Sequence, residues 1–254
     1  MAKLRAHETV GFAEFTIERN PRKMPCTLSI EGPDDTVFTL IPAGTRLPAS
    51  FSQVFTSAGS FEMSTYLHLV LGERVLASAN HDLCVIRFDE GGFRMAGKAQ
   101  FQLDVEVSGN GRMRVGARNL EKANGGKPKV LFDSQVVTKQ VLAEISRVAQ
   151  DAQEKDALIK ERFDFMSSVR DKVNEMSGDL WAVSKRKLTW TEKREFKACR
   201  KRVYALIEPG PEGVSEEQLI ELREIMDVAL PQWEELMTQR AKQVMAQYEP
   251  RRKK

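Results

Sequence analysis

The chain has 254 residues, with 39 lysines and arginines against 36 aspartates and glutamates. Its charges nearly cancel, so no overall field favours a nucleic acid as partner. It begins without an apolar run and contains no stretch long enough to span a bilayer, so we expect no secretory signal, no membrane partner and a cytoplasmic location.

Up to about residue 133, apolar residues recur with the two-residue period of strands. Proline, glycine, asparagine and aspartate separate these segments at short spacing, as in an antiparallel sandwich or barrel. The first segment reads as an additional strand that covers a sheet edge. The expected strands are residues 10–18, 27–31, 36–41, 53–57, 64–71, 83–88, 100–107, 112–117 and 129–132.

The hairpin between residues 100–107 and 112–117 tests the register. A two-residue turn would set Val107 opposite Arg114, which places an apolar and a charged side chain on one face. A three-residue loop at 109–111 pairs Val107 with Met113 and Glu106 with Arg114, so we expect the longer loop. Gly111 then takes the left-handed position of a bulge.

Beyond residue 134 the apolar pattern has the helical period. One stripe runs from Val141 to Met176 and predicts one long helix or two successive ones. Thr189 and Ser215 have the spacing of capping boxes and open two further helices. The fold class is therefore α+β, with an antiparallel β-sandwich domain at 1–133 and a helical domain at 134–254.

Several runs in the first half occur together and in order: residues 39–41, 47–48, 52–58 and 71–74, with Asn80 and Gly111. Their sequences, such as Leu71-Gly72-Glu73-Arg74, resemble the peptide-binding C-terminal half of the seventy-kilodalton heat-shock (DnaK-type) chaperones. This resemblance implies a β-sandwich that holds an extended apolar peptide under a helical lid.

The resemblance also implies the site. It assigns some residues to a pocket for a peptide side chain, others to an arch over the peptide, and one to a position next to Phe55. Relatives carry a branched aliphatic residue at Thr65 and often a larger flexible one at Pro33. The hydroxyl of Thr65 and the bulk of Phe101 imply a pocket that is shallower or more polar than usual. The peptide-binding residues are Ile30, Phe55, Thr65, Leu67 and Phe101 for the pocket, Pro33 and Ala58 for the arch, and Thr56 beside them.

Catalytic features are not expected. Three cysteines and three histidines lie without metal-ligand spacing, and His68 reads as a satisfied or solvent-facing imidazole within a strand. The Asp34-Asp35 pair falls in a turn, where local hydrogen bonds explain it. The glycine pairs at 91–92 and 125–126 read as turns and not as phosphate cradles. We therefore expect no catalytic residue, no metal, no cofactor, no ATPase domain and no enzyme.

The resulting hypothesis is ATP-independent, chaperone-like binding of unfolded or extended polypeptide, with a separately encoded ATPase-domain chaperone as a candidate partner. The alternative is an interaction or assembly module with the same fold, which binds one dedicated partner or associates with itself. A third reading is a fragment of a larger chaperone. The basic runs at 185–187 and 200–202 read as helix surface, with an acidic partner or nucleic acid as the less favoured interpretation.

Overall fold

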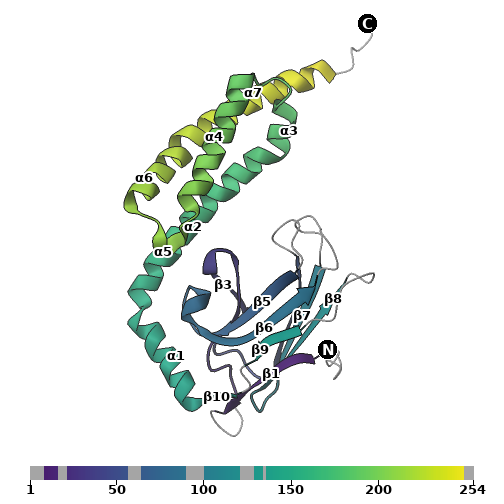
Figure 1. The fold of residues 1–254 in the computed structure, drawn as a ribbon, viewed down its shortest axis with the longest axis vertical. Helices are drawn as coiled ribbons and strands as arrows, with labels where there is room; N and C mark the ends of the chain where they lie inside the picture. Colours follow the sequence, from purple (N-terminus) through teal and green to yellow (C-terminus); the bar gives the residue numbers. More distant parts are fainter. Residues whose placement is uncertain are drawn as a thin grey trace. The chain divides into compact units, whose positions relative to one another are not determined.

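The computed structural model describes residues 9–16, 22–56, 64–89, 100–120, 129–133 and 136–248. The chain divides into two compact units, Met1–Gln153 and Glu154–Lys254. The first unit contains two five-stranded sheets and the second is helical (Figure 1). The expected α+β class, with antiparallel sheets followed by helices, is confirmed at this level.

Nine of the described strands in the first unit overlap the expected segments, although β4 begins at Ala49 and not at residue 53, and β10 matches no expected segment. One sheet has the order β10-β1-β8-β7-β4 and the other β3-β2-β5-β6-β9. The described pairings are antiparallel, apart from the parallel pair of β1 and β10. The strands are β1 Thr9–Thr16, β2 Leu28–Glu31, β3 Val37–Ile41, β4 Ala49–Thr56, β5 Ser64–Leu71, β6 His81–Asp89, β7 Gln100–Val107, β8 Arg112–Asn119, β9 Lys129–Asp133 and β10 Val136–Thr138.

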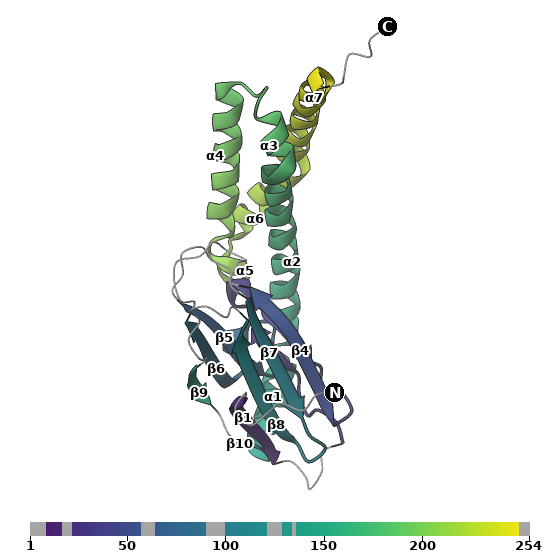
Figure 2. The same cartoon turned by 90° about the vertical axis from the view of Figure 1, so that its right-hand side faces the viewer.

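The two sheets share one hydrophobic core (Figure 2). Alternate residues of β7, from Phe101 to Val107, are buried against residues of the other sheet. The rings of Phe88 on β6 and Phe101 on β7 lie 4.6 Å apart between centroids, and such tilted aromatic pairs add to the energy of burial. The two-residue period of the sequence therefore marks the inner faces of both sheets.

Strand β1 is an interior strand. It pairs with β8 on one side and with β10 on the other. The extra strand expected near residue 10 thus covers an edge of β8 that would otherwise offer unpaired backbone groups.

The β7–β8 hairpin has the predicted three-residue register. Val107 lies opposite Met113, and Glu106 lies opposite Arg114. Gly111 has a φ of 83°, a conformation that glycine adopts without steric cost. The side chain of Ser108 closes the loop by donating to the carbonyl of Arg112 at 2.8 Å.

The division between the units falls later than the change of period. Helix α1, Lys139–Asp151, begins where Thr138 caps it by accepting from the backbone N–H of Val141. Its Leu142 is part of the core of the first unit, and Val141 and Ile145 pack against that core. The structure therefore places α1 with the sheets and the division at 153–154, whereas the sequence pattern set it at 133–134.

The second unit is built from α2 and the helices that follow it. Its core joins residues of every longer helix, among them Val173, Phe196 and Met237. The capping boxes predicted at Thr189 and Ser215 are both present. The helices are α2 Gln153–Glu175, α3 Trp181–Ser184, α4 Trp190–Ile207, α5 Gly210–Gly213, α6 Glu216–Glu224 and α7 Leu230–Tyr248, with π-helical turns at Met176–Leu180 and Ile225–Ala229.

None of the helices in the described ranges has both the length and the apolarity needed to cross a membrane.

Candidate functional site

The candidate pocket joins the two sheets at one end. Phe55 on β4 lies directly opposite Phe101 on β7, and the ring of Phe101 contacts that of Phe88 on β6. Phe88 in turn lies opposite Thr65 on β5. A continuous row of side chains thus leads from one sheet to the other. Its most distant members in the sequence, Phe55 and Phe101, are 46 positions apart.

Ile30 and Leu67 extend this row along the second sheet. Ile30 on β2 pairs with Leu69 on β5, so Leu67 is its diagonal neighbour on the same face. Ile30 also pairs with Phe38 on the edge strand β3, whose side chain is 50% exposed. The structure therefore brings together the five residues assigned to the pocket, and it adds Phe38, which sequence reasoning missed.

The burial of these side chains differs. Ile30, Leu67 and Phe101 are 2%, 7% and 0% exposed and belong to the closed core, whereas Phe55 and Thr65 are half-buried. The interior of the row is closed because Phe88 and Phe101 fill the space between the sheets. The accessible surface at this end comes from the half-buried pair, whereas Phe38 lies opposite Ile30, whose partner Leu69 is four residues along β5 from Thr65.

Three further residues belong to the predicted peptide site. Thr56 is exposed at the end of β4. Pro33 begins a short 3-10 turn, Pro33–Asp35, and its side chain is not described. Ala58 lies outside the described residues. The predicted arch of Pro33 and Ala58 thus stays a prediction.

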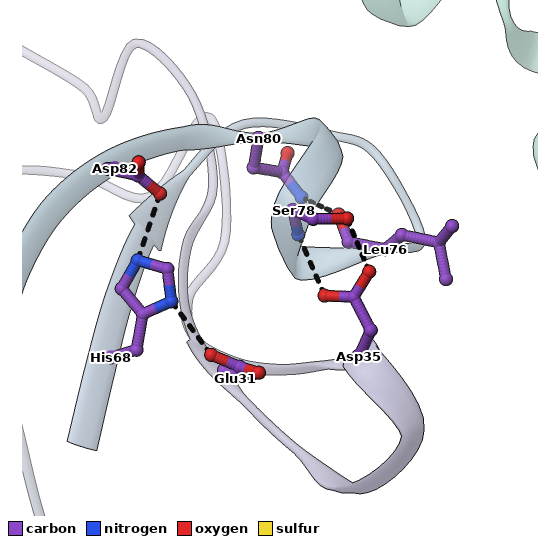
Figure 3. A network of polar contacts seen from close by, with 7 residues as sticks. All are labelled: Glu31, Asp35, His68, Leu76, Ser78, Asn80 and Asp82. Atoms are coloured by element: carbon purple, nitrogen blue, oxygen red, sulfur yellow. Dashed lines mark hydrogen bonds and ion pairs between the residues drawn. The ribbon is translucent and has the colours of Figure 1, made fainter. Parts of the chain in front are cut away.

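The signature residues that carried the family resemblance have structural roles. Gly72 has a φ of 154°, and a Cβ atom there would lie 2.2 Å from Oδ1 of Asn80. Asn80 donates from Nδ2 to the carbonyl of Leu76 at 2.8 Å (Figure 3). It also donates from Nδ2 to the carbonyl of Arg74 at 2.9 Å and accepts from the Arg74 N–H at 3.0 Å. Glycine at position 72 and asparagine at position 80 therefore determine one loop together.

A second polar network links neighbouring strands (Figure 3). The ring of His68 on β5 lies 2.8 Å by Nδ1 from Glu31 on β2, and 2.9 Å by Nε2 from Asp82 on β6. Of the two expected readings of His68, a satisfied or a solvent-facing imidazole, the structure shows the first. Its partners could not be predicted, because they are 37 and 14 residues away.

The Asp34-Asp35 pair is not explained by local bonds alone. Both residues have a φ of 58°, the left-handed region that aspartate tolerates better than most residues. The carboxylate of Asp35 accepts from the backbone N–H of Ser78 at 2.8 Å and from the Ser78 hydroxyl. The expectation of a purely local role is therefore wrong for Asp35, which ties the β2–β3 turn to the segment before β6.

One cavity of about 400 Å³ lies in the first unit, between α1 and the segment from Leu71 to His81. Its walls include Val141, Ile145 and Val148 of α1. It is distinct from the row at Phe55 and Phe101. Within the described ranges, no group of three acidic, cysteine or histidine side chains could hold a metal ion.

A family model and several curated proteins match this chain. A family model described as Hsp70 protein matches residues 23–237. The chain belongs to the Hsp70 family. The match includes most described strands and all the described helices up to the middle of α7, so both units carry the Hsp70 relationship.

Curated relatives are chaperone proteins DnaK. The chain is 31% identical to DnaK of Ureaplasma urealyticum over 154 residues, which are 60% of this chain and 25% of that protein. It is 27% identical to DnaK of Thermoplasma acidophilum over 187 residues, 70% of this chain and 30% of that protein. The matches thus span less than a third of these relatives' own length.

These comparisons correct two predictions. The Hsp70 and DnaK matches point to the ATPase region of the family and not to its C-terminal half. On this finding, the assignment to the C-terminal peptide-binding half without an ATPase domain is wrong, and so is the prediction that the chain is not an enzyme. Short runs, such as residues 71–74, carry the resemblance to the C-terminal half, whereas the family model matches residues 23–237.

Two features of the chain bear on nucleotide binding. The glycine pairs at 91–92 and 125–126 lie outside the described residues. Within the described part, β10 passes directly into α1 at Thr138, with no glycine-rich loop between them, although such a loop before a helix is the usual phosphate cradle. Direct measurement of ATP binding and hydrolysis by this chain therefore accompanies the experiment below.

Proposed function

We propose that this Hsp70-family chain acts in the cytoplasm as a chaperone that binds extended apolar polypeptide at the end of the sheets marked by Phe55 and Thr65. The helical unit would serve as a lid. The observation that carries the proposal is the row of apolar side chains from both sheets, closed at Phe101 and accessible at Phe55 and Thr65.

An extended peptide offers alternating side chains and unpaired backbone groups. Strand β4 lies at the end of its sheet order, so one side of it is available for backbone contacts beside Phe55 and Thr56. Burying one leucine side chain contributes about 1.5 to 3 kcal/mol. Because micromolar binding requires about 8 kcal/mol, backbone contacts and the lid have to supply the rest.

The closed interior sets the depth of the proposed site. Phe88 and Phe101 occupy the space that a deep side-chain pocket would need. A bound side chain would therefore rest on Phe55 and Thr65 or would displace an aromatic ring. This arrangement favours a shallow site with broad sequence tolerance, because backbone contacts do not distinguish side chains.

The test uses a fluorescein-labelled, leucine-rich heptapeptide and its fluorescence anisotropy. Phe55→Ala is expected to weaken binding at least tenfold. Phe51→Ala is the matched control, because Phe51 lies on the same face of β4, is half-buried and packs against the same core. Equal binding by wild type, Phe55→Ala and Phe51→Ala, or no saturable binding at all, would remove the proposal.

Two further arms address the lid and the nucleotide. A chain that ends at Gln153 retains the core of the first unit and is expected to release peptide faster than the full chain. Each titration is repeated with ATP and Mg²⁺, and phosphate release is measured in parallel. These arms decide whether nucleotide couples to peptide binding in this chain.

The alternative is a module that binds one dedicated partner or associates with itself, and the closed positions of Ile30, Leu67 and Phe101 favour it. It predicts one defined partner in pull-down mass spectrometry, with a separately encoded ATPase-domain chaperone as a candidate. Recovery of many unrelated unfolded proteins would instead support general peptide binding.

A further inference from the structure

Two aromatic side chains of the helical unit are exposed. Trp190 at the start of α4 is 72% exposed, and Tyr248 at the end of α7 is 65% exposed. By contrast, Trp181 and Trp233 pack against Phe196 in the core of this unit. Trp190 and Tyr248 are therefore not part of the hydrophobic core, and their exposure calls for another explanation.

The start of α4 and the end of α7, where these residues stand in the sequence, lie toward the same end of the helical unit (Figures 1 and 2). Arg186, in the connection between α3 and α4, donates from Nη1 to the Tyr248 hydroxyl at 2.6 Å, and its guanidinium lies 5.9 Å from the ring centroid. Arg240 of α7 donates to Glu192 in the first turn of α4 at 3.0 Å. These contacts hold the start of α4 and the last part of α7 together.

Basic groups surround the aromatics. Lys185 and Lys187 are exposed on either side of Arg186. The guanidinium of Arg194 lies 5.5 Å from the Trp190 ring centroid. We call this set, Lys185, Arg186, Lys187, Trp190, Arg194 and Tyr248, the aromatic–basic end.

Acidic groups only partly balance this charge. Glu192 is engaged by Arg240 and by the backbone N–H of Thr189 at 2.6 Å, and Glu195 is exposed one turn further along α4. Within the described residues, this set holds four positive side chains, Lys185, Arg186, Lys187 and Arg194, against the exposed Glu195. The end therefore has a positive excess, although the whole chain carries a formal charge of only +3.

We propose that the aromatic–basic end binds the surface of an anionic lipid bilayer. Tryptophan and tyrosine are enriched at the level of the lipid headgroups, because their rings are amphipathic. Lysine and arginine next to them gain energy from the negative surface potential. The end would lie on the membrane as a peripheral contact and would not span it.

A lipid surface fits this end better than a nucleic acid. Both aromatics are at the tip of a helical unit, each with a guanidinium beside its ring. Single-stranded nucleic acids bind in a positively charged groove that follows the backbone, and none of the described cavities lies at this end. The expectation of no membrane partner rested on the lack of a spanning segment, which does not bear on peripheral binding.

The experiment is co-sedimentation of the full chain with vesicles. One set contains phosphatidylcholine alone, and the other contains phosphatidylcholine with about a third of phosphatidylglycerol, a fraction chosen to give a strong negative surface potential. Lys185→Gln with Lys187→Gln is expected to lower the partition coefficient roughly 30-fold, since each lysine near such a surface contributes about 1 kcal/mol. Wild type should also show a blue shift of tryptophan emission that Trp190→Ala loses.

The matched control is Lys139→Gln with Lys160→Gln, which removes the same charge from exposed positions on α1 and α2. Lys160 lies 15 residues before the end of α2 at Glu175, or about 22 Å along the helix. Circular dichroism verifies that all variants remain folded. Retained binding by the control pair, with loss in the Lys185 and Lys187 pair, supports the proposal.

Three results would overturn it: no preference for the anionic vesicles, equal losses in both lysine pairs, or an unshifted Trp190 emission on binding. A competition arm with poly(U) distinguishes the nucleic-acid reading. If poly(U) binds through Lys185 and Lys187 more tightly than the vesicles do, the surface is a nucleic-acid site and the lipid proposal fails.

Discussion

Gly72 and Asn80 provide a quantitative test of the loop between β5 and β6. A Cβ atom on residue 72 would lie 2.2 Å from Oδ1 of Asn80, so Gly72→Ala has to displace the amide. Asn80 makes three hydrogen bonds, with Arg74 twice and Leu76 once. Losing them costs about 2 to 4 kcal/mol, and the φ of 154° adds about 1 kcal/mol of strain for alanine. Gly72→Ala should therefore destabilise the first unit by about 3 to 5 kcal/mol.

A double-mutant cycle separates this mechanism from a general loss of stability. Asn80→Ala alone should cost about 2 to 4 kcal/mol, because it removes the same three hydrogen bonds. In the double variant, Gly72→Ala with Asn80→Ala, the new Cβ atom no longer meets the Asn80 amide. The total loss of stability should therefore be smaller than the sum of the two single losses by about 2 kcal/mol. Additivity within about 0.5 kcal/mol would refute the reasoning.

The assay is urea unfolding followed by far-ultraviolet circular dichroism. All three tryptophans, Trp181, Trp190 and Trp233, belong to the helical unit, so their fluorescence reports on that unit in the same sample. The strand signal should lose stability while the tryptophan midpoint stays in place. A shift of the tryptophan midpoint alone would show that the substitution acts elsewhere.

Three further predictions follow from single sites. Phe101→Val opens space beside Phe88 in the closed row, so anisotropy should show tighter binding of a leucine-rich peptide, at a stability cost of about 1 to 3 kcal/mol; unchanged affinity would contradict a site limited by Phe101. Burial raises the pKa of the Cys26 thiol to about 12, so iodoacetamide at pH 8 should modify the half-buried Cys199 faster than Cys26. The contribution of Cys26 to the free energy of unfolding should be complete below the usual thiol pKa and should fall as the pH rises above it. The Thr189 N–H, with Arg240, lowers the pKa of Glu192, so Glu192→Gln should lower the free energy of unfolding by about 1 kcal/mol at pH 7. This difference, measured by tryptophan fluorescence, should vanish as the pH falls below the usual carboxyl pKa. A cost that persists at low pH would exclude the ionised carboxylate as its source.

Local rules explain which parts of the fold the sequence could predict. The capping boxes at Thr189 and Ser215 act over three residues, so spacing alone identifies them. The register of the β7–β8 hairpin follows from the alternation of Val107, Met113 and their neighbours. Both predictions needed only contacts between residues that are close in sequence.

Long-range contacts explain what the sequence could not predict. Asp35 accepts hydrogen bonds from Ser78, 43 residues away, and His68 contacts two carboxylates on other strands. The position of α1 is a similar case, because periodicity shows that residues 139–151 form a helix but not which core its Leu142 joins. The boundary at 133 therefore follows the local pattern, while the structural division at 153 follows the packing.

The candidate site shows this limit most clearly. Ile30, Phe55, Thr65, Leu67 and Phe101 come from four strands, and their meeting at one end of the sheets depends on register and sheet order together. Sequence resemblance could nominate these positions but could not show that Phe88 packs onto Phe101 and closes the interior. Peptide binding at this end thus depends on whether Phe55 and Thr65 suffice as a surface or an aromatic ring moves. Comparing Phe101→Val with Phe55→Ala distinguishes the two, since only a ring that blocks entry improves binding when it is made smaller.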